Sequence, residues 1–262
     1  MKLLSILILV FITNALSCNS SAPVISNSFS LSSYQEGKAG IVTAYHSKDG
    51  HFFINGVGFV VKLDSIYLVI TNRHNVSNND FYTNKPGLSQ EELLFVNFFT
   101  FKDQNYTAYD LPVRSGGTDL FFGNSYNSNL TDLIGIPFKP NIEDIKFDPI
   151  DLNSNVQIKK GDEVFSISVI TTESKMFSSF VKFATIVSDP AKEDSSEFGI
   201  LPIVLLDKYS LPGNSGSPVF TWPDKSKSPI FVGILSGNVH GNGFFWRKDI
   251  LVNLLNDIRK EL

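Results

Sequence analysis

Cysteine is nearly absent from this chain, which has one cysteine, Cys18, among 262 residues. A single cysteine excludes an intrachain disulfide, a zinc site made only of cysteines, and an iron–sulfur cluster. Sites built from other ligands are not excluded by this count. Nothing in the residue pattern calls for a metal or an organic cofactor, so we expect neither.

Clusters of basic residues are also missing. The 22 Lys and Arg residues are outnumbered by 26 Asp and Glu residues, which makes the formal net charge −4. Nucleic-acid-binding domains gather basic side chains on one face, so we expect no nucleic-acid partner. Hydrophobic residues make up 42% of the chain and charged residues 18%, which is typical of a globular protein and excludes an intrinsically disordered one.

The apolar run near the N-terminus is short. Residues 3–12 form ten largely apolar positions after Lys2, whereas a membrane-spanning helix needs about 20. A small residue at 15 and another at 17 follow this run. A positive start, a short apolar stretch and small residues are the pattern of a secretory signal peptide, which we predict over residues 1–17. We therefore expect the protein to be exported.

Cys18 directly follows this segment, and two interpretations stay open. Its position resembles that of the lipidated cysteine of a bacterial lipoprotein, although Ala15 and Leu16 stand where such proteins usually carry leucine and a small residue. The alternative is a free thiol. We favour the lipid, because an odd cysteine directly after a signal peptide needs an explanation. The expected location is the outer surface or periplasm as a membrane-attached lipoprotein, or the medium as a secreted protein.

The body of the chain is rich in residues that favour strands, including 23 Phe and 8 Tyr. From about residue 41, short apolar runs alternate with clusters of Asn, Asp, Gly and Ser. These runs are strand-length and show no helical period. They span residues 59–63, 66–70, 93–101, 133–138, 163–170, 180–187, 203–206 and 229–236. The pattern predicts an all-β protein of antiparallel barrels or sandwiches.

Other stretches deviate from this pattern. Residues 18–36 are rich in Ser and Asn and predict a tether or an irregular N-terminal segment. The polar stretches 102–131 and 188–199 predict long surface loops. At the other end, apolar residues recur at helical spacing from Ile250, so residues 249–261 predict a C-terminal helix that packs on the body, with Asp249 as its N-cap.

A candidate nucleophile lies in residues 211–220, which read LPGNSGSPVF. A serine flanked by glycines can sit on a tight turn with its hydroxyl exposed, which makes Ser215 the candidate. The backbone N–H groups of Gly213 and Ser215 would then form an oxyanion hole, where each donor stabilises the transition state by about 2.7–4 kcal/mol. For this segment alone, an ordinary Gly/Ser/Pro turn is the alternative.

A candidate base and acid precede it in the chain. His74 stands at the end of a strand-like run, and histidine titrates near neutrality, as an activator of serine must. Asp132 opens an apolar strand and would orient the imidazole, with Asp110 and Asp119 as rivals for this role. A structural histidine and a loop aspartate are the simpler alternatives, but the chain order His, Asp, Ser favours a catalytic triad.

Five motifs, in islands over about residues 40–240, resemble the trypsin/chymotrypsin-like serine peptidases. The resemblance is to the bacterial branch that includes the glutamyl endopeptidases and the high-temperature-requirement proteases. The motifs are GVGFVV (56–61), TNRHNV (71–76), TDLIGI (131–136), KGDEV (160–164) and GNSGSPVF (213–220). The resemblance implies two six-stranded antiparallel barrels, at about 37–145 and 155–240, within a peptidase domain of residues 37–262. It also implies an endopeptidase that acts on protein or peptide substrates through an acyl-enzyme.

The same resemblance implies a substrate pocket. Its residues would be Tyr209, Ser210, Leu235, Ser236, Gly237 and His240, with Ser236 also bonding Asp132. Tyr209 stands where trypsin-like enzymes carry an aspartate, so we expect no Lys or Arg specificity and a neutral pocket that the phenol fills. Leu235 stands where glutamyl endopeptidases carry a histidine, which argues against glutamate specificity. Asn214 replaces the aspartate that pairs with a freed N-terminus in digestive enzymes, so we expect no activation of that kind.

Two other functions are compatible with parts of the sequence. A non-catalytic surface module for binding or adhesion could use the same fold, since fold does not guarantee function. An esterase of the α/β-hydrolase type fits poorly, because its triad runs in the order Ser, Asp, His. The sequence predicts no oligomeric state.

Overall fold

The computed structural model describes residues 31–45, 52–77, 95–102, 105–126, 129–140, 145–171, 177–196 and 199–261. The predicted signal peptide (1–17) and Cys18 lie outside these residues. Within the described residues, no helix has both the length and the apolar character needed to cross a membrane.

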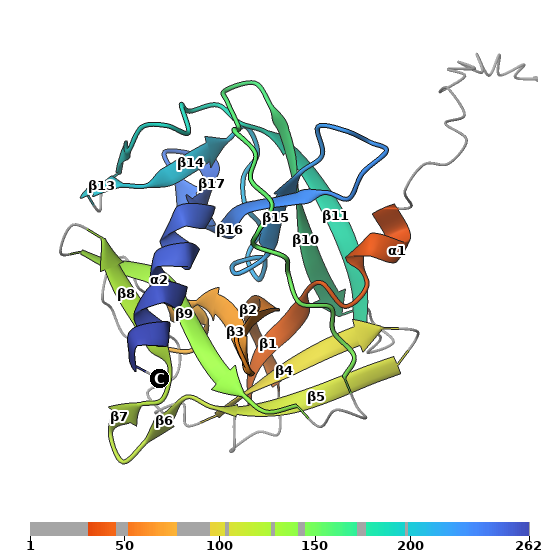
Figure 1. Cartoon of the computed structure of the whole chain (residues 1–262), viewed down its shortest axis with the longest axis vertical. Helices are drawn as coiled ribbons and strands as arrows, with labels where there is room; N and C mark the ends of the chain where they lie inside the picture. The colour runs from red at the N-terminus through yellow and green to blue at the C-terminus, as the bar shows by residue number, and fades with distance from the viewer. Residues whose placement is uncertain are drawn as a thin grey trace, which may run out of the picture.

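The first half of the chain folds into one curled antiparallel sheet (Figure 1). Its spatial order is β5-β4-β1-β2-β3-β9-β8. A two-stranded hairpin of β6 (Arg114–Ser115) and β7 (Thr118–Asp119) adjoins it in sequence. The seven strands are β1 (Gly40–Tyr45), β2 (Phe52–Leu63), β3 (Ile66–Asn72), β4 (Phe95–Lys102), β5 (Asn105–Pro112), β8 (Phe122–Tyr126) and β9 (Asn129–Phe138).

The second half forms a six-stranded antiparallel sheet in the order β11-β10-β15-β16-β17-β14. A separate hairpin pairs β12 (Asp194–Ser196) with β13 (Gly199–Leu201). Two antiparallel barrels were expected, and this all-β architecture is confirmed, with seven paired strands in place of six in the first sheet. The six strands are β10 (Glu163–Thr171), β11 (Phe177–Thr185), β14 (Ile203–Leu206), β15 (Pro218–Thr221), β16 (Ile230–Val239) and β17 (Asn242–Arg247).

The apolar runs become strands because both of their faces are covered. In β3, Leu68 and Ile70 belong to the largest core cluster, whereas Val69 between them packs in a second cluster inside the first barrel. The largest cluster also crosses between the barrels, where the rings of Phe59 and Phe231 lie 5.4 Å apart. The two barrels therefore share a core, which fixes the faces they turn toward each other.

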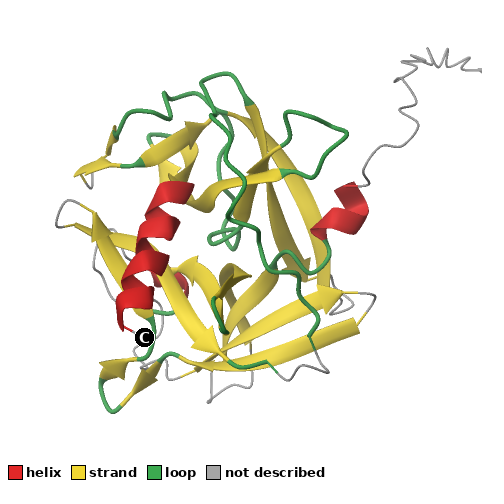
Figure 2. Ribbon diagram, in the orientation of Figure 1, coloured by secondary structure: helices red, strands yellow, loops and turns green. Residues whose placement is uncertain are grey.

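The C-terminal helix α2 (Lys248–Glu261) confirms the helical spacing read from the sequence (Figure 2). Its buried face, which includes Ile250 and Leu254, packs on both sheets, against β8, β9, β16 and β17. Asp249 is not the N-cap that was expected. The helix begins one residue earlier, and the Asp249 carboxylate pairs with the Arg247 guanidinium at 3.0 Å.

Two expectations from polar composition were wrong. Residues 31–35, expected in a tether, form helix α1 (Leu31–Gln35), because Tyr34 packs edge-on against Phe220, at 5.6 Å between centroids. Residues 102–131, expected to be a loop, contain strands β5 to β8 and the start of β9. Sheet strands with one solvent face keep polar residues outward while a residue such as Leu111 on β5 is buried.

Candidate functional site

His74 lies on a single turn of 3-10 helix, η1 (Arg73–Asn75), that directly follows β3. The turn is closed by a bond from the Val76 N–H to the Arg73 carbonyl, at 3.0 Å. Before it, the buried Asn72 amide donates to the Asp132 carbonyl at 2.9 Å. The His74 side chain remains 24% exposed, so one side of the imidazole faces the solvent.

Asp132 lies on β9 directly beside this turn and is fully buried. Its Oδ2 lies 2.7 Å from His74 Nδ1, and its Oδ1 accepts the His74 backbone N–H at 3.1 Å. The Ser236 hydroxyl also donates to Oδ2, at 2.8 Å. Buried carboxylates are tolerated when both oxygens accept such bonds. Because the carboxylate accepts from Nδ1, the imidazole presents Nε2 away from it.

The two rival acids lie elsewhere. The Asp119 carboxylate forms an exposed ion pair with Arg114 at 2.7 Å. Asp110 accepts a hydrogen bond from the Asn97 amide on the neighbouring strand β4. Of the three candidates, the structure brings Asp132 to His74.

The nucleophile loop, residues 211–217, depends on glycines in the left-handed region. Gly213 has φ +83° and Gly216 has φ +92°. A Cβ at Gly216 would lie 1.8 Å from the Val57 carbonyl oxygen, so no larger residue fits there. Within the described residues, the N–H groups of Gly213 and Ser215 donate to no acceptor, and both remain available to an incoming oxygen.

The first barrel holds this loop through its main chain. The Ser215 carbonyl accepts from the Val57 N–H at 2.7 Å and from the Asn75 side-chain amide at 2.9 Å. The same amide nitrogen donates to the Thr71 hydroxyl at 2.9 Å. Asn75 follows His74 in the 3-10 turn, so one turn carries the predicted base and holds the predicted nucleophile. The sequence interpretation missed Asn75, because its burial is visible only in the fold.

The hydroxyl of Ser215 does not donate to the histidine. It donates to the Ser236 carbonyl at 2.5 Å, and a hydroxyl has only one proton to give. The structure therefore brings His74, Asp132 and Ser215 to one site but joins only the first two through side chains.

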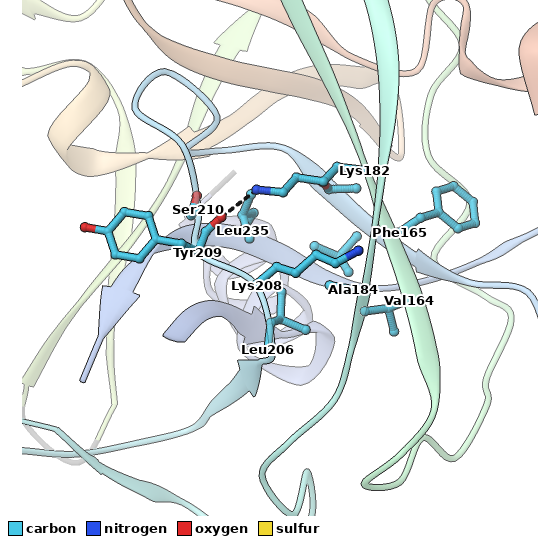
Figure 3. Close-up of a pocket in the computed structure, with 11 residues that line it drawn as sticks. Val164, Phe165, Lys182, Ala184, Leu206, Lys208, Tyr209, Ser210 and Leu235 are labelled. Carbon is cyan, nitrogen blue, oxygen red and sulfur yellow. Dashed lines mark hydrogen bonds between the residues drawn. The ribbon is translucent and has the colours of Figure 1, made fainter. Parts of the chain in front are cut away.

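The residues predicted to form the substrate pocket differ in location and in exposure. Ser210 and Leu235 are buried in the lining of a pocket on the second barrel, and Gly237 is half-buried at an irregularity in β16. Tyr209 is 56% exposed, and its ring points away from the other lining residues (Figure 3). The expectation that its phenol fills the pocket was wrong, because it is the Tyr209 carbonyl that turns inward, where it accepts from Lys182. His240 lies on the exposed turn between β16 and β17, with φ +51°.

Two residues that line this pocket, and a third that bonds to its Ser210 segment, were missed from the sequence. Asn238 fixes the Ser210 segment, since its Oδ1 accepts the Ser210 N–H at 2.6 Å and its amide donates to the Ser210 carbonyl at 2.9 Å. Lys182 and Lys208 line the same pocket (Figure 3). Burial, and then the like charge of Lys208, lowers the pKa of the Lys182 ammonium. None of the three lies in one of the five motifs.

The part of the chain that the structure describes contains no cluster of three or more His, Cys, Asp or Glu side chains that could hold a metal ion. No family model matches the chain, and no curated protein matches it.

Solved structures do match. The MamO protease domain from Magnetospirillum magneticum, in its apo form, has 16% identity and a TM-score of 0.52 over 83% of this chain and 95% of that one. The structure titled human heparin binding protein has 13% identity and the same TM-score over 91% of this chain and 98% of that one. At these identities the likeness shows the fold, which is the two-barrel fold of the trypsin/chymotrypsin-like proteins.

Proposed function

We propose that this chain is an exported serine endopeptidase that hydrolyses peptide bonds through an acyl-enzyme. The observation that carries the proposal is the 2.7 Å contact between His74 Nδ1 and the fully buried Asp132 carboxylate, beside the glycine-rich turn of Ser215. The chymotrypsin-like fold supports it, because this fold accommodates such a site in other proteins. The substrate would be a protein or a peptide.

In the proposed mechanism, Ser215 Oγ attacks the carbonyl carbon of the peptide bond while His74 Nε2 takes the hydroxyl proton. Asp132 keeps the imidazole oriented and stabilises its charged form. The N–H groups of Gly213 and Ser215 bind the oxygen that becomes negative. His74 then protonates the leaving amine, and water repeats the sequence on the acyl-enzyme and releases the acid.

The finer placement is part of the same proposal. The motifs around His74, Asp132 and Ser215 support a place in the bacterial branch with the glutamyl endopeptidases and the high-temperature-requirement proteases. The segment before Cys18 supports export, with a lipid on that cysteine. Labelling bacteria with a fatty-acid analogue tests the lipid. Wild type is expected to take up label and Cys18→Ser to lose it, whereas an unlabelled wild type would indicate free secretion.

The second candidate is a non-catalytic binding module on the same fold. One observation favours it, namely that the Ser215 hydroxyl donates to the Ser236 carbonyl and not to the base. One of the similar folds belongs to a protein titled as heparin binding, which illustrates that binding is one use of this architecture.

A fluorophosphonate probe distinguishes the two candidates. Residues 19–262 would be treated with the probe, and the intact mass of the protein would be measured by mass spectrometry. The variants Ser215→Ala and His74→Ala would be treated in the same way, with Ser226→Ala, at an exposed serine, as the matched control. A peptidase is expected to take up one adduct, lost in the first two variants and kept in the control. A folded protein that takes up none would favour the binding module.

A further inference from the structure

Two lysines and a buried hydroxyl share the pocket drawn in Figure 3. Apolar side chains of β10, β11, β14, β15 and β16 form much of its wall, and Lys182, Lys208 and Ser210 supply polar groups. No carboxylate is among the described residues that line it. Two acids directly adjoin lining residues along the chain: Asp207 accepts the Thr185 N–H at 2.7 Å, and Glu163 pairs with Lys225 at 3.8 Å.

The polar groups of the pocket have unused donors. Lys182 Nζ donates to the Tyr209 carbonyl at 2.5 Å, and Lys208 Nζ donates to the Phe183 carbonyl at 2.7 Å. Each ammonium has three N–H donors, so both retain some. Ser210 is only 4% exposed, and its hydroxyl has no partner within the described structure. A buried unpaired hydroxyl is costly, so this group favours a ligand that accepts its hydrogen bond.

The pocket is also bonded to the nucleophile loop. Leu235, in its wall, donates its N–H to the Ser217 carbonyl at 2.9 Å and accepts the Gly216 N–H at 2.7 Å. The next residue, Ser236, accepts the hydroxyl of Ser215. These bonds set one wall residue of the pocket against the nucleophile loop, so a peptide held at Ser215 would bring a neighbouring side chain or its own end toward this side of the second barrel.

We propose that Lys182, Lys208 and Ser210 bind a carboxylate of the peptide substrate, supplied by an acidic side chain or by a free C-terminus. This inference rests on the proposed function. A carboxylate is the ligand that separates two like charges and accepts from the orphaned hydroxyl. The enclosed space is about 10 Å³, room for roughly one water molecule, so the lysine side chains swing outward when the carboxylate enters.

The site differs from the neutral pocket expected from Tyr209, and from the absence of glutamate specificity expected from Leu235. Its positive charge comes from Lys182 on β11 and from Lys208 in the segment after β14. The proposal therefore predicts a preference for acidic peptides that the motif residues argue against.

Binding of matched peptides to the Ser215→Ala variant tests the proposal without requiring catalysis. One pair differs only by Glu against Gln at a single position, with amidated ends. A second, neutral pair differs only by a free against an amidated C-terminus. We expect the carboxylate member of at least one pair to bind about tenfold tighter or more, since a charge-assisted contact supplies the difference. The pair that responds identifies the source of the carboxylate.

Lysine variants show whether the pocket causes that preference. The quantity compared is the ratio of the affinities for the two peptides of the responding pair. Lys182→Met and Lys208→Met are each expected to bring this affinity ratio toward one. Lys182→Arg is expected to keep the ratio, and Lys182→Glu to reverse the preference. Lys192→Met is the matched control, since its side chain is 79% exposed and pairs with Asp189 outside the pocket. Thermal melting of every variant checks that it folds.

Equal binding of both members in both pairs would overturn the proposal, as would a preference that all lysine variants retain. Fluorophosphonate labelling of the wild type tests the proposed function separately. A carboxylate preference that depends on the lysines, in a protein that takes up no probe, would retain the pocket and reject the peptidase.

Discussion

The two barrels contribute unequally prepared halves of the candidate site. In the first barrel, His74 and Asp132 are in direct contact, and both carboxylate oxygens accept hydrogen bonds in a fully buried position. In the second barrel, Ser215 lies on a glycine loop and its hydroxyl is bonded to the Ser236 carbonyl. The first half is preorganised, because its two side chains are bonded to each other, whereas in the second half the Ser215 hydroxyl is bonded to a main-chain carbonyl. A buried carboxylate therefore orients the imidazole, whereas a main-chain carbonyl holds the serine hydroxyl.

The inequality has a structural origin. Strands β3 and β9 pair in an antiparallel ladder that sets Asn72 opposite Leu133, so the turn after β3 begins beside Asp132. The nucleophile loop lies between β14 and β15, outside any ladder. It is held instead by main-chain bonds to Val57 and Leu235. The ladder sets Asp132 beside His74, whereas these bonds hold only the main chain of the loop, and the Ser215 hydroxyl bonds separately to the Ser236 carbonyl.

Breaking the contact between His74 and Asp132 should have the largest effect on the rate of labelling. Asp132→Asn keeps the size of the side chain but favours the wrong imidazole tautomer, so we expect fluorophosphonate labelling to slow by about ten-thousandfold. The labelling rate measures this. The matched control is Asp119→Asn, which removes an exposed partner of Arg114 and should label at the wild-type rate. Equal rates for the two variants would contradict the assignment of Asp132.

Displacing the nucleophile loop should have the next largest effect. Gly216→Ala would place a Cβ against the Val57 carbonyl and add strain at positive φ. We expect labelling to slow by about a hundredfold, because a displacement near 1 Å has such an effect on a reacting group. Thermal melting should show a lower Tm. Gly161→Ala is the control, since it also has positive φ but a Cβ there would meet nothing within 4 Å. Wild-type labelling and an unchanged Tm in Gly216→Ala would contradict the close approach of Gly216 to the Val57 carbonyl.

Asn75 links the two halves, and its removal tests that link. Asn75→Ala removes donors to the Ser215 carbonyl and the Thr71 hydroxyl, so we expect labelling to slow by about tenfold. Asn75→Asp should be slower still, because a carboxylate there faces an acceptor it cannot bond. The pH dependence of labelling gives the readout, since a change in its midpoint reports on His74. If both variants only lower the Tm, Asn75 is a structural residue.

Ser236 touches both halves and should show the smallest effect. Ser236→Ala removes the hydroxyl bonded to Asp132 but keeps the main-chain carbonyl that accepts from Ser215. We expect labelling to slow by about fivefold, since one hydrogen bond contributes about 1 kcal/mol. Ser236→Thr, which restores the hydroxyl, should recover most of the rate. An alanine variant that labels faster than wild type would contradict the supporting role of this hydroxyl.

Much of the fold could be predicted because apolar runs report burial directly. The strands around residues 59–70 and 133–138 and the C-terminal helix, predicted over residues 249–261, were found in this way. The strands β5 and β8 and helix α1 were missed. A strand with one solvent-exposed face contains few apolar residues, and so does a one-turn helix that is held by Tyr34. Polar composition does not distinguish such elements from loops.

The site could be predicted only in part, for a similar reason. His74, Asp132 and Ser215 lie in motifs, and their types and order by themselves indicate chemistry. Asn75 lies in the motif around His74, but its amide chemistry marks no role until its distant partner Ser215 is beside it, and Lys182 lies in no motif. The ring of Tyr209 was expected inside the pocket but is exposed, because the direction of a side chain depends on the backbone around it.

The sequence by itself determined the all-β class, the C-terminal helix and the three candidate residues, because hydrophobic period and residue chemistry are local properties. The tertiary structure alone decided which acid meets His74, where the hydroxyl of Ser215 points, and which charges surround the pocket. These depend on strand register, on main-chain bonds across the two barrels and on the direction of side chains. Such contacts join residues from distant parts of the chain, and folding alone brings them together.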